Sequence, residues 1–100
     1  MERIERIAAM EARLTKADTV LDITEEALDK LEAELADIKA LTDYYGSPDW
    51  HSDYEADERG ELPPDMPCGV LGEDYVYDVI GRRRELAIRM LDLATAMLKQ

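Results

Sequence analysis

The sequence predicts an all-α protein: a long, coiled-coil-like helical hairpin with a long ordered acidic connector, which dimerisation can complete as a bundle. Three observations predict this fold. Residues 1–45 contain no Gly and no Pro, apolar residues recur there every seven positions, and a second apolar face at helical spacing follows Gly72. Because 100 residues supply only one small core, we expect a single helical domain over residues 1–100.

The first helix is predicted over residues 2–45, where Ala, Leu, Glu, Lys and Arg dominate and lose little side-chain freedom on becoming helical. Two apolar sets, offset by three residues, occupy heptad positions a and d. The a set is Ile7, Leu14, Leu21, Leu28 and Leu35, and the d set is Met10, Ala17, Thr24, Leu31, Ile38 and Tyr45. Thr19, Asp22 and Thr24 can cap a new helix, so a break near residues 18–24 is the alternative. The unchanged heptad phase favours one continuous helix.

The second helix is predicted over residues 72–99. Glu73 and Asp74 suit its first turn because carboxylates complement the positive end of the helix dipole, and Gly72 is an acceptable N-cap. Gly81 costs about 1 kcal/mol relative to Ala inside a helix, so we hypothesise that it permits close contact with Trp50. The apolar face consists of Val76, Val79, Ile80, Leu86, Ala87, Met90, Leu93, Ala94 and Met97.

The two predicted helices differ in length, which leaves part of the first without a partner. At about 1.5 Å per residue the second helix spans roughly 40 Å, and in an antiparallel hairpin it ends near Asp18. Ile4, Ile7, Met10 and Leu14 are then uncovered. Either the first helix folds back into a three-helix bundle, or a second chain covers the overhang; we hypothesise a homodimer.

The connector, residues 46–71, is longer than most loops of compact domains and carries spaced residues with apolar bodies. We expect a short helix or turn over residues 52–60, ended by Gly60, and an aromatic cluster that anchors the connector. The residues of this predicted structural clasp are Tyr45, Trp50, Tyr54, Leu62 and Tyr77. The alternative for the aromatic residues is an open groove that binds a peptide.

Residues 44–80 contain a recognisable set of aromatic, acidic, glycine and proline residues: Tyr44, Tyr45, Trp50, Asp53 to Glu58, Gly60, Leu62, Pro63, Asp65, Gly69 to Leu71, Glu73, Asp74 and Tyr77. This set resembles the characteristic segment of a small bacterial family, domain of unknown function 4298. Gly72 departs from it, because a Ser is expected there as a side-chain cap. Since that family has no assigned activity, the resemblance implies a fold and no function.

Asp53, Glu55 and Asp57 alternate like the first ligands of an EF-hand calcium loop. The match then fails, because Gly60 comes two positions late and Pro64 stands where a bidentate Glu is needed. A weak divalent-metal site on these three residues remains an alternative, as does a cluster of Asp49, His51 and Asp53 if that segment is extended. No cofactor is expected.

No catalytic constellation can be assembled from the sequence. Cys68 is the only thiol, His51 is the only conceivable base for it, and no third orienting group can be identified. The sequence therefore predicts a protein that is not an enzyme.

The net charge of −12 is concentrated in the middle of the chain, where residues 43–74 carry ten acidic and one basic side chain. Such a segment repels a phosphate backbone, so direct nucleic-acid binding is not expected. Arg82, Arg83, Arg84 and Arg89 are expected to pair with the acidic connector or with the first helix; an anion-binding patch is the alternative.

A single Cys excludes an intrachain disulfide, and no run of apolar residues is long enough for a signal peptide or a membrane span. These features predict a soluble cytoplasmic protein with no membrane partner. The function they favour is a non-catalytic protein–protein interaction or scaffold protein, whose partner the sequence does not identify. The alternatives are a weak metal-binding module and an acidic decoy of a nucleic-acid-binding protein.

Overall fold

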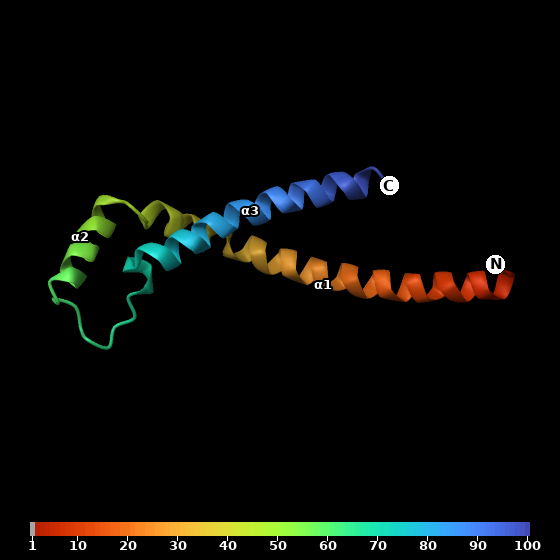
Figure 1. Ribbon diagram of the computed structural model, residues 1–100, viewed down its shortest axis with the longest axis horizontal. Coiled ribbons are helices and arrows are strands. Elements are labelled where there is room, and N and C mark those ends of the chain that lie inside the picture. The colour runs from red at the N-terminus through yellow and green to blue at the C-terminus, as the bar shows by residue number, and fades with distance from the viewer. Residues whose placement is uncertain (1) are drawn as a thin grey trace. The chain divides into compact units, whose positions relative to one another are not determined.

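The computed structural model describes residues 2–100 and contains three α-helices and one short 3₁₀ helix (Figure 1). The elements are α1 (Arg3–Tyr44), α2 (Pro48–Glu58), η1 (Gly69–Leu71) and α3 (Glu73–Leu98). No strand occurs among the described residues, so the prediction of an all-α protein is confirmed. The chain divides into two compact units, one ending at Ile38 and one running from Lys39 to Gln100, and each is described by itself.

Helix α1 continues without a break through residues 18–24, where the sequence could have started a new helix. The hydroxyl groups there bond back to the preceding turn of the same helix. Thr19 Oγ1 donates to the Thr15 carbonyl at 3.1 Å, and Thr24 Oγ1 donates to the Val20 carbonyl at 2.8 Å. A hydroxyl used in this way does not cap a new helix, and the heptad phase continues across it.

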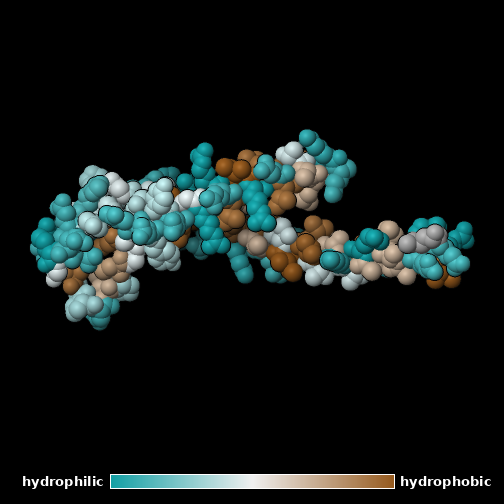
Figure 2. Space-filling view, viewed as in Figure 1, coloured by the Kyte–Doolittle hydropathy of each residue, from teal (hydrophilic) through white to brown (hydrophobic). Residues whose placement is uncertain are grey.

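None of the residues of α1 is buried. Its a and d residues from Ile7 to Ile38 form a row that we call the seam, and most of its large apolar members are about half exposed, including Leu21 at 54% and Leu28 at 48%. Apolar side chains lie at intervals along the surface of this helix (Figure 2). A heptad stripe is a surface by which helices pack on one another, and most of this stripe is exposed in α1.

Helix α2 lies within the connector and begins at Pro48, four residues before the predicted start at Ser52. Ser47 is its N-cap, with Oγ accepting from the Trp50 backbone N–H at 3.2 Å, and Pro48 occupies the first turn. The helix ends at Glu58, and Gly60 terminates it as predicted: φ of Gly60 is +71°, and the Gly60 and Glu61 amides donate to the Asp57 and Ala56 carbonyls. This pair of bonds is a Schellman motif.

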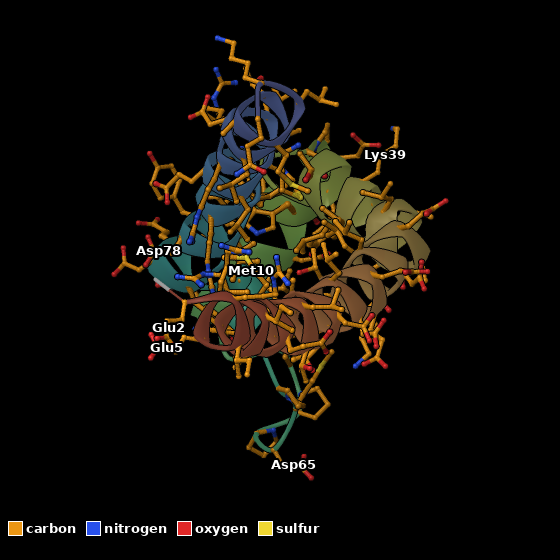
Figure 3. All side chains as sticks on the ribbon, turned by 90° about the vertical axis from the view of Figure 1, so that its right-hand side faces the viewer. Glu2, Glu5, Met10, Lys39, Asp65 and Asp78 are labelled. Carbon is orange, nitrogen blue, oxygen red and sulfur yellow. The ribbon has the colours of Figure 1, made fainter. Side chains whose placement is uncertain are left out.

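Residues 59–68 form a loop without regular structure, in which the Met66 amide donates to the Pro63 carbonyl at 3.1 Å. Asp65 lies at the far end of this loop (Figure 3). η1 follows, and α3 then begins after Gly72, which forms no side-chain cap hydrogen bond. Glu73 and Asp74 occupy the first turn of α3, where the sequence places them.

The core of the unit from Lys39 to Gln100 is small. Trp50 of α2, Leu71 of η1 and Val76 of α3 are the buried apolar residues among those described, each 6% exposed or less. The three come from three different elements, so this core fixes the connector to the start of α3.

Candidate functional site

Trp50 joins α2 to η1. Its indole Nε1–H donates to the Val70 carbonyl at 2.9 Å, across a separation of twenty residues. The ring itself is buried, so without this hydrogen bond the indole N–H would have neither a protein acceptor nor water. Trp50 therefore closes the connector into a loop with its two ends held together.

Two tyrosines enclose the indole and complete what we call the aromatic clasp, Tyr45, Trp50 and Tyr54. The Tyr45 ring meets the indole edge-on, with centroids 5.1 Å apart and planes at 73°. Tyr54 stacks on it at 5.4 Å and 22°. Both arrangements are favourable for aromatic quadrupoles. Three of the five residues predicted for a structural clasp thus lie together.

The other two predicted residues lie differently. Leu62 is half-buried in the loop after α2, and none of the described ring contacts includes Tyr77, which is 66% exposed on α3. The prediction for Tyr77 is wrong for a geometric reason. Val76 is the buried position at this level of α3, and the next residue of a helix points about 100° away.

Gly81 also does not contact Trp50. A Cβ built on Gly81 meets no atom within 4 Å, so this glycine makes room for no neighbouring side chain. The hypothesis that Gly81 permits a close approach of the indole is therefore wrong.

Tyr44, the last residue of α1, is bound to α2. Its phenol donates to Asp53 Oδ2 at 2.6 Å. This hydrogen bond, helped by partial burial and by the negative charges of Asp53 and Asp49, raises the pKa of Tyr44 to about 12. The carboxylates of Glu58 and Glu73 likewise raise the pKa of Tyr54 above its ordinary value. Acidic side chains thus hold both phenols in their neutral form.

The three candidate metal ligands lie on α2 and do not converge. Residues two positions apart on a helix point about 200° apart, so Glu55 faces away from Asp53 and Asp57. Asp53 accepts from Tyr44, and Glu55 Oε2 lies 3.9 Å from Arg59 Nη1. Within residues 2–100, no group of three or more His, Cys, Asp or Glu side chains is placed to hold a metal ion. The cluster of Asp49, His51 and Asp53 required an extended segment, and it does not form because these residues also lie on helix α2.

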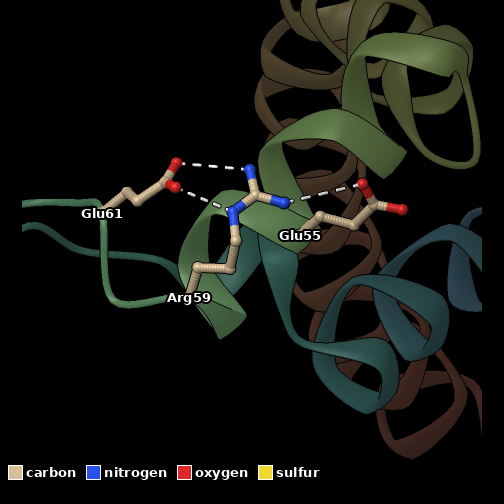
Figure 4. A network of polar contacts seen from close by, with 3 residues as sticks. All are labelled: Glu55, Arg59 and Glu61. Atoms are coloured by element: carbon tan, nitrogen blue, oxygen red, sulfur yellow. Dashed lines mark hydrogen bonds and ion pairs between the residues drawn. The ribbon is translucent and has the colours of Figure 1, made fainter.

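Arg59 connects the end of α2 to the loop that follows (Figure 4). Its Nε and Nη2 donate to the two carboxylate oxygens of Glu61 at 2.8 and 3.2 Å, which lowers the pKa of Glu61. Arg59 also lies close to Glu55, and all three side chains of this network are exposed. The network therefore contributes little to stability.

The arginines of α3 do not form the predicted ion pairs. The ion pairs among the described residues join Lys39 to Asp43 and Arg59 to Glu55 and Glu61. Arg83 Nε donates to the Ile80 carbonyl of its own helix at 3.4 Å. Arg82, Arg84 and Arg89 are exposed, so the expectation that the acidic connector neutralises them is wrong within this chain.

Cys68 is half-buried just before η1, and its thiol donates to the Met66 carbonyl at 3.4 Å. His51 lies on α2, with its ring 5.1 Å from the indole of Trp50. No contact described for either residue joins the thiol to the imidazole.

A shallow apolar pocket of about 190 Å³ lies beside the clasp, within the unit from Lys39 to Gln100. Its lining residues come from the end of α1, from η1 and from the start of α3: Leu41, Gly69, Val70, Tyr75, Val76 and Val79. Sequence reasoning missed this pocket. The signal available was the apolar run Val70–Leu71 directly before a predicted apolar helix face.

Comparison with known proteins identifies a family and no relative of known activity. A family model described as a domain of unknown function, DUF4298, matches residues 7–93. No curated protein and no solved structure matches the chain. None of the helices in the described part of the chain is long and apolar enough to cross a membrane.

Proposed function

We propose that this protein, which belongs to the family of domain of unknown function 4298, is a non-catalytic protein–protein interaction or scaffold protein that self-associates through α1. The observation that carries the proposal is the exposed seam. A helix of 42 residues presents apolar side chains at heptad spacing and buries none of them. A row of exposed apolar side chains at heptad spacing is typical of a surface that binds another helix.

A second copy of the chain is the partner that we propose for the seam. Every copy exposes the same a and d residues, and identical heptad stripes are complementary to each other in length and phase. The notable member is Thr24, a polar residue at a d position. Because its hydroxyl already donates to the Val20 carbonyl, it can enter a helix interface without an unpaired donor.

The unit from Lys39 to Gln100 is the part we propose for contact with another protein. Its clasp holds η1 against α2, and the apolar pocket beside η1 can receive one apolar side chain. We place this activity in a bacterial cytoplasm, because a lone free thiol suits a reducing compartment.

Two matched substitutions test self-association. Leu21 is an a residue of the seam, whereas Ile23 is a c residue, and the two have similar exposures of 54% and 62%. Leu21→Glu should shift the protein toward monomer in sedimentation equilibrium at micromolar concentration, because it places a charge in the interface. Ile23→Glu adds the same charge outside the seam, and this variant should keep the molar mass that the wild type has in sedimentation equilibrium. A wild-type protein that is monomeric at these concentrations would refute the proposal.

A further inference from the structure

The residues that flank the seam carry charges that specify the direction of a partner helix. In a two-stranded coiled coil these are heptad positions e and g, whose interhelical pairs set partner choice and orientation. In a parallel pair, each g residue lies beside the e residue five positions later in the other helix. In an antiparallel pair, g faces g and e faces e.

The two flanks of α1 differ in sign where they would meet. With Ile7 at position a, the e flank is acidic over four successive heptads and ends in a base: Glu11, Asp18, Glu25, Glu32 and Lys39. The g flank begins with bases and ends in an acid: Arg6, Arg13, Val20, Ala27 and Glu34. At the C-terminal end of the helix both flanks change sign: the e flank ends in Lys39 and the g flank ends in Glu34.

We infer that α1 pairs with α1 of a second copy in parallel and in register. This arrangement sets Arg6 beside Glu11 of the other copy, Arg13 beside its Asp18, and Glu34 beside its Lys39. All three pairs are attractive, and each occurs on both edges of the coil. The two remaining g residues, Val20 and Ala27, are uncharged, so no like charges meet. The inference rests on the self-association proposed above and adds its geometry.

The antiparallel arrangement sets acid against acid. Because four successive e residues are acidic, an antiparallel register that overlaps most of the seams brings e carboxylates together. When Leu21 packs on Ala17 of the other copy, for example, Glu11 faces Glu25 and the two Asp18 side chains face each other. Like charges in such positions destabilise the pair.

The charges that the parallel pair needs are available in the structure. Among the described residues, Arg6, Glu11, Arg13 and Asp18 form no ion pair, and all are exposed. Lys39 contacts Asp43 four residues on, with Nζ 2.6 Å from Oδ2. Both of those side chains are more than 60% exposed, so the ion pair contributes little to stability. Lys39 can therefore leave Asp43 and pair with Glu34 of the other copy.

Parallel pairing has a functional consequence that antiparallel pairing lacks. The C-terminal ends of both α1 helices lie at the same end of the coil. The two units that begin at Lys39 therefore start from one end, and the assembly offers two apolar pockets to a partner. A partner with two binding segments then gains avidity.

Disulfide cross-linking tests the direction. In a Cys68→Ser background, Met10→Cys places a thiol at a d position near the N-terminus of α1, and Ala12→Cys is a control on the outer f position. In a glutathione buffer, the Met10→Cys protein should form a disulfide-linked dimer about tenfold more favourably than the Ala12→Cys protein, because the parallel pair holds its thiols together. A mixture of Met10→Cys and Leu28→Cys chains should yield no cross-linked heterodimer. Preferential linkage of position 10 to position 28 would overturn the inference.

A charge reversal gives an independent test whose sign depends on direction. Glu11→Lys turns the attraction to Arg6 into repulsion in the parallel pair, so the dissociation constant should rise about five- to tenfold. In the antiparallel pair the same change removes an acid–acid contact and the dissociation constant should fall. Glu26→Lys makes the same change in net charge at an outer f position and should have little effect. A tighter dimer with Glu11→Lys contradicts the parallel arrangement.

The outcomes separate this inference from the proposed function. A wild-type monomer at micromolar concentration refutes both. A dimer that cross-links position 10 to position 28 keeps the self-association and refutes only the direction. A trimeric mass in sedimentation equilibrium refutes the two-chain assembly.

Discussion

Replacing Trp50 by Ala should destabilise the protein by about 3–5 kcal/mol, the usual cost of truncating a buried Trp. The indole is 6% exposed, so nearly its whole surface lies against protein. The change removes three ring contacts and the hydrogen bond to the Val70 carbonyl, and leaves Leu71 and Val76 as the remaining buried apolar residues of the described chain. Since small domains unfold at a cost of about 5–15 kcal/mol, this loss is a large fraction of the total.

Urea unfolding followed by far-ultraviolet circular dichroism, at one fixed protein concentration, measures the effect. Two variants separate its causes. Trp50→Phe keeps an aromatic ring and loses the Nε1–H donor, so it should cost about 1 kcal/mol plus a smaller packing term. Tyr77→Ala removes an aromatic residue that is 66% exposed and should change stability by less than about 0.5 kcal/mol.

The reasoning fails if Trp50→Ala unfolds at the same urea concentration as the wild type. The indole would then contribute nothing to the fold, and the aromatic clasp would have to be a binding surface. It also fails if Tyr77→Ala is as destabilising as Trp50→Ala, because the exposed ring would then be part of the core.

Two further predictions concern single groups. Tyr44 should titrate near pH 12 in a phenolate absorbance titration, measured as the difference between the wild type and Tyr44→Phe. The pKa of Tyr44 in the folded protein lies above the ordinary value of 10.0. The stability that this phenol contributes is therefore complete below pH 10 and is lost as the pH rises through 12. A difference spectrum with its midpoint near 10 would show that the bond to Asp53 does not form in solution. Gly81→Ala should raise the free energy of unfolding by up to about 1 kcal/mol, because a Cβ there meets nothing. Gly60→Ala should lower the free energy of unfolding by a similar amount, because φ of Gly60 is +71°. If both substitutions changed the free energy of unfolding in the same direction, this explanation of the two glycines would be wrong.

The helices were predictable because their signals are local. The heptad spacing of α1 and the two acids at the start of α3 depend only on residues close in sequence. The start of α2 carried equally local signals, since Ser47, Pro48 and Asp49 are the residue types of an N-cap and a first turn. Sequence reasoning overlooked these signals and expected the helix or turn to begin at Ser52. The alternative cluster of Asp49, His51 and Asp53 required an extended segment, and the helix that begins at Pro48 excludes it.

The contacts of the site were only partly predictable. The burial of Trp50 was predicted from its large apolar ring and from the aromatic residues close to it in the sequence. Its acceptor could not be inferred, because the Val70 group that it bonds is a backbone carbonyl, and every residue type offers one. Tyr77 was misplaced because a helix turns about 100° per residue, so an error of one position moves a side chain from the core into solvent.

If α1 self-associates as proposed, the exposed seam and the small core couple its folding to that association. Helices in proteins gain most of their stability from packing an apolar face, and no residue of α1 is buried in this chain. Its composition favours helix, yet residues before Lys39 have no core of their own to hold them there. The proposed pairing with a second α1 would supply that packing over the length of the heptad pattern. The charges on the e and g flanks would then act on a helix that the same association stabilises, and the direction of pairing and the stability of α1 would depend on one set of contacts.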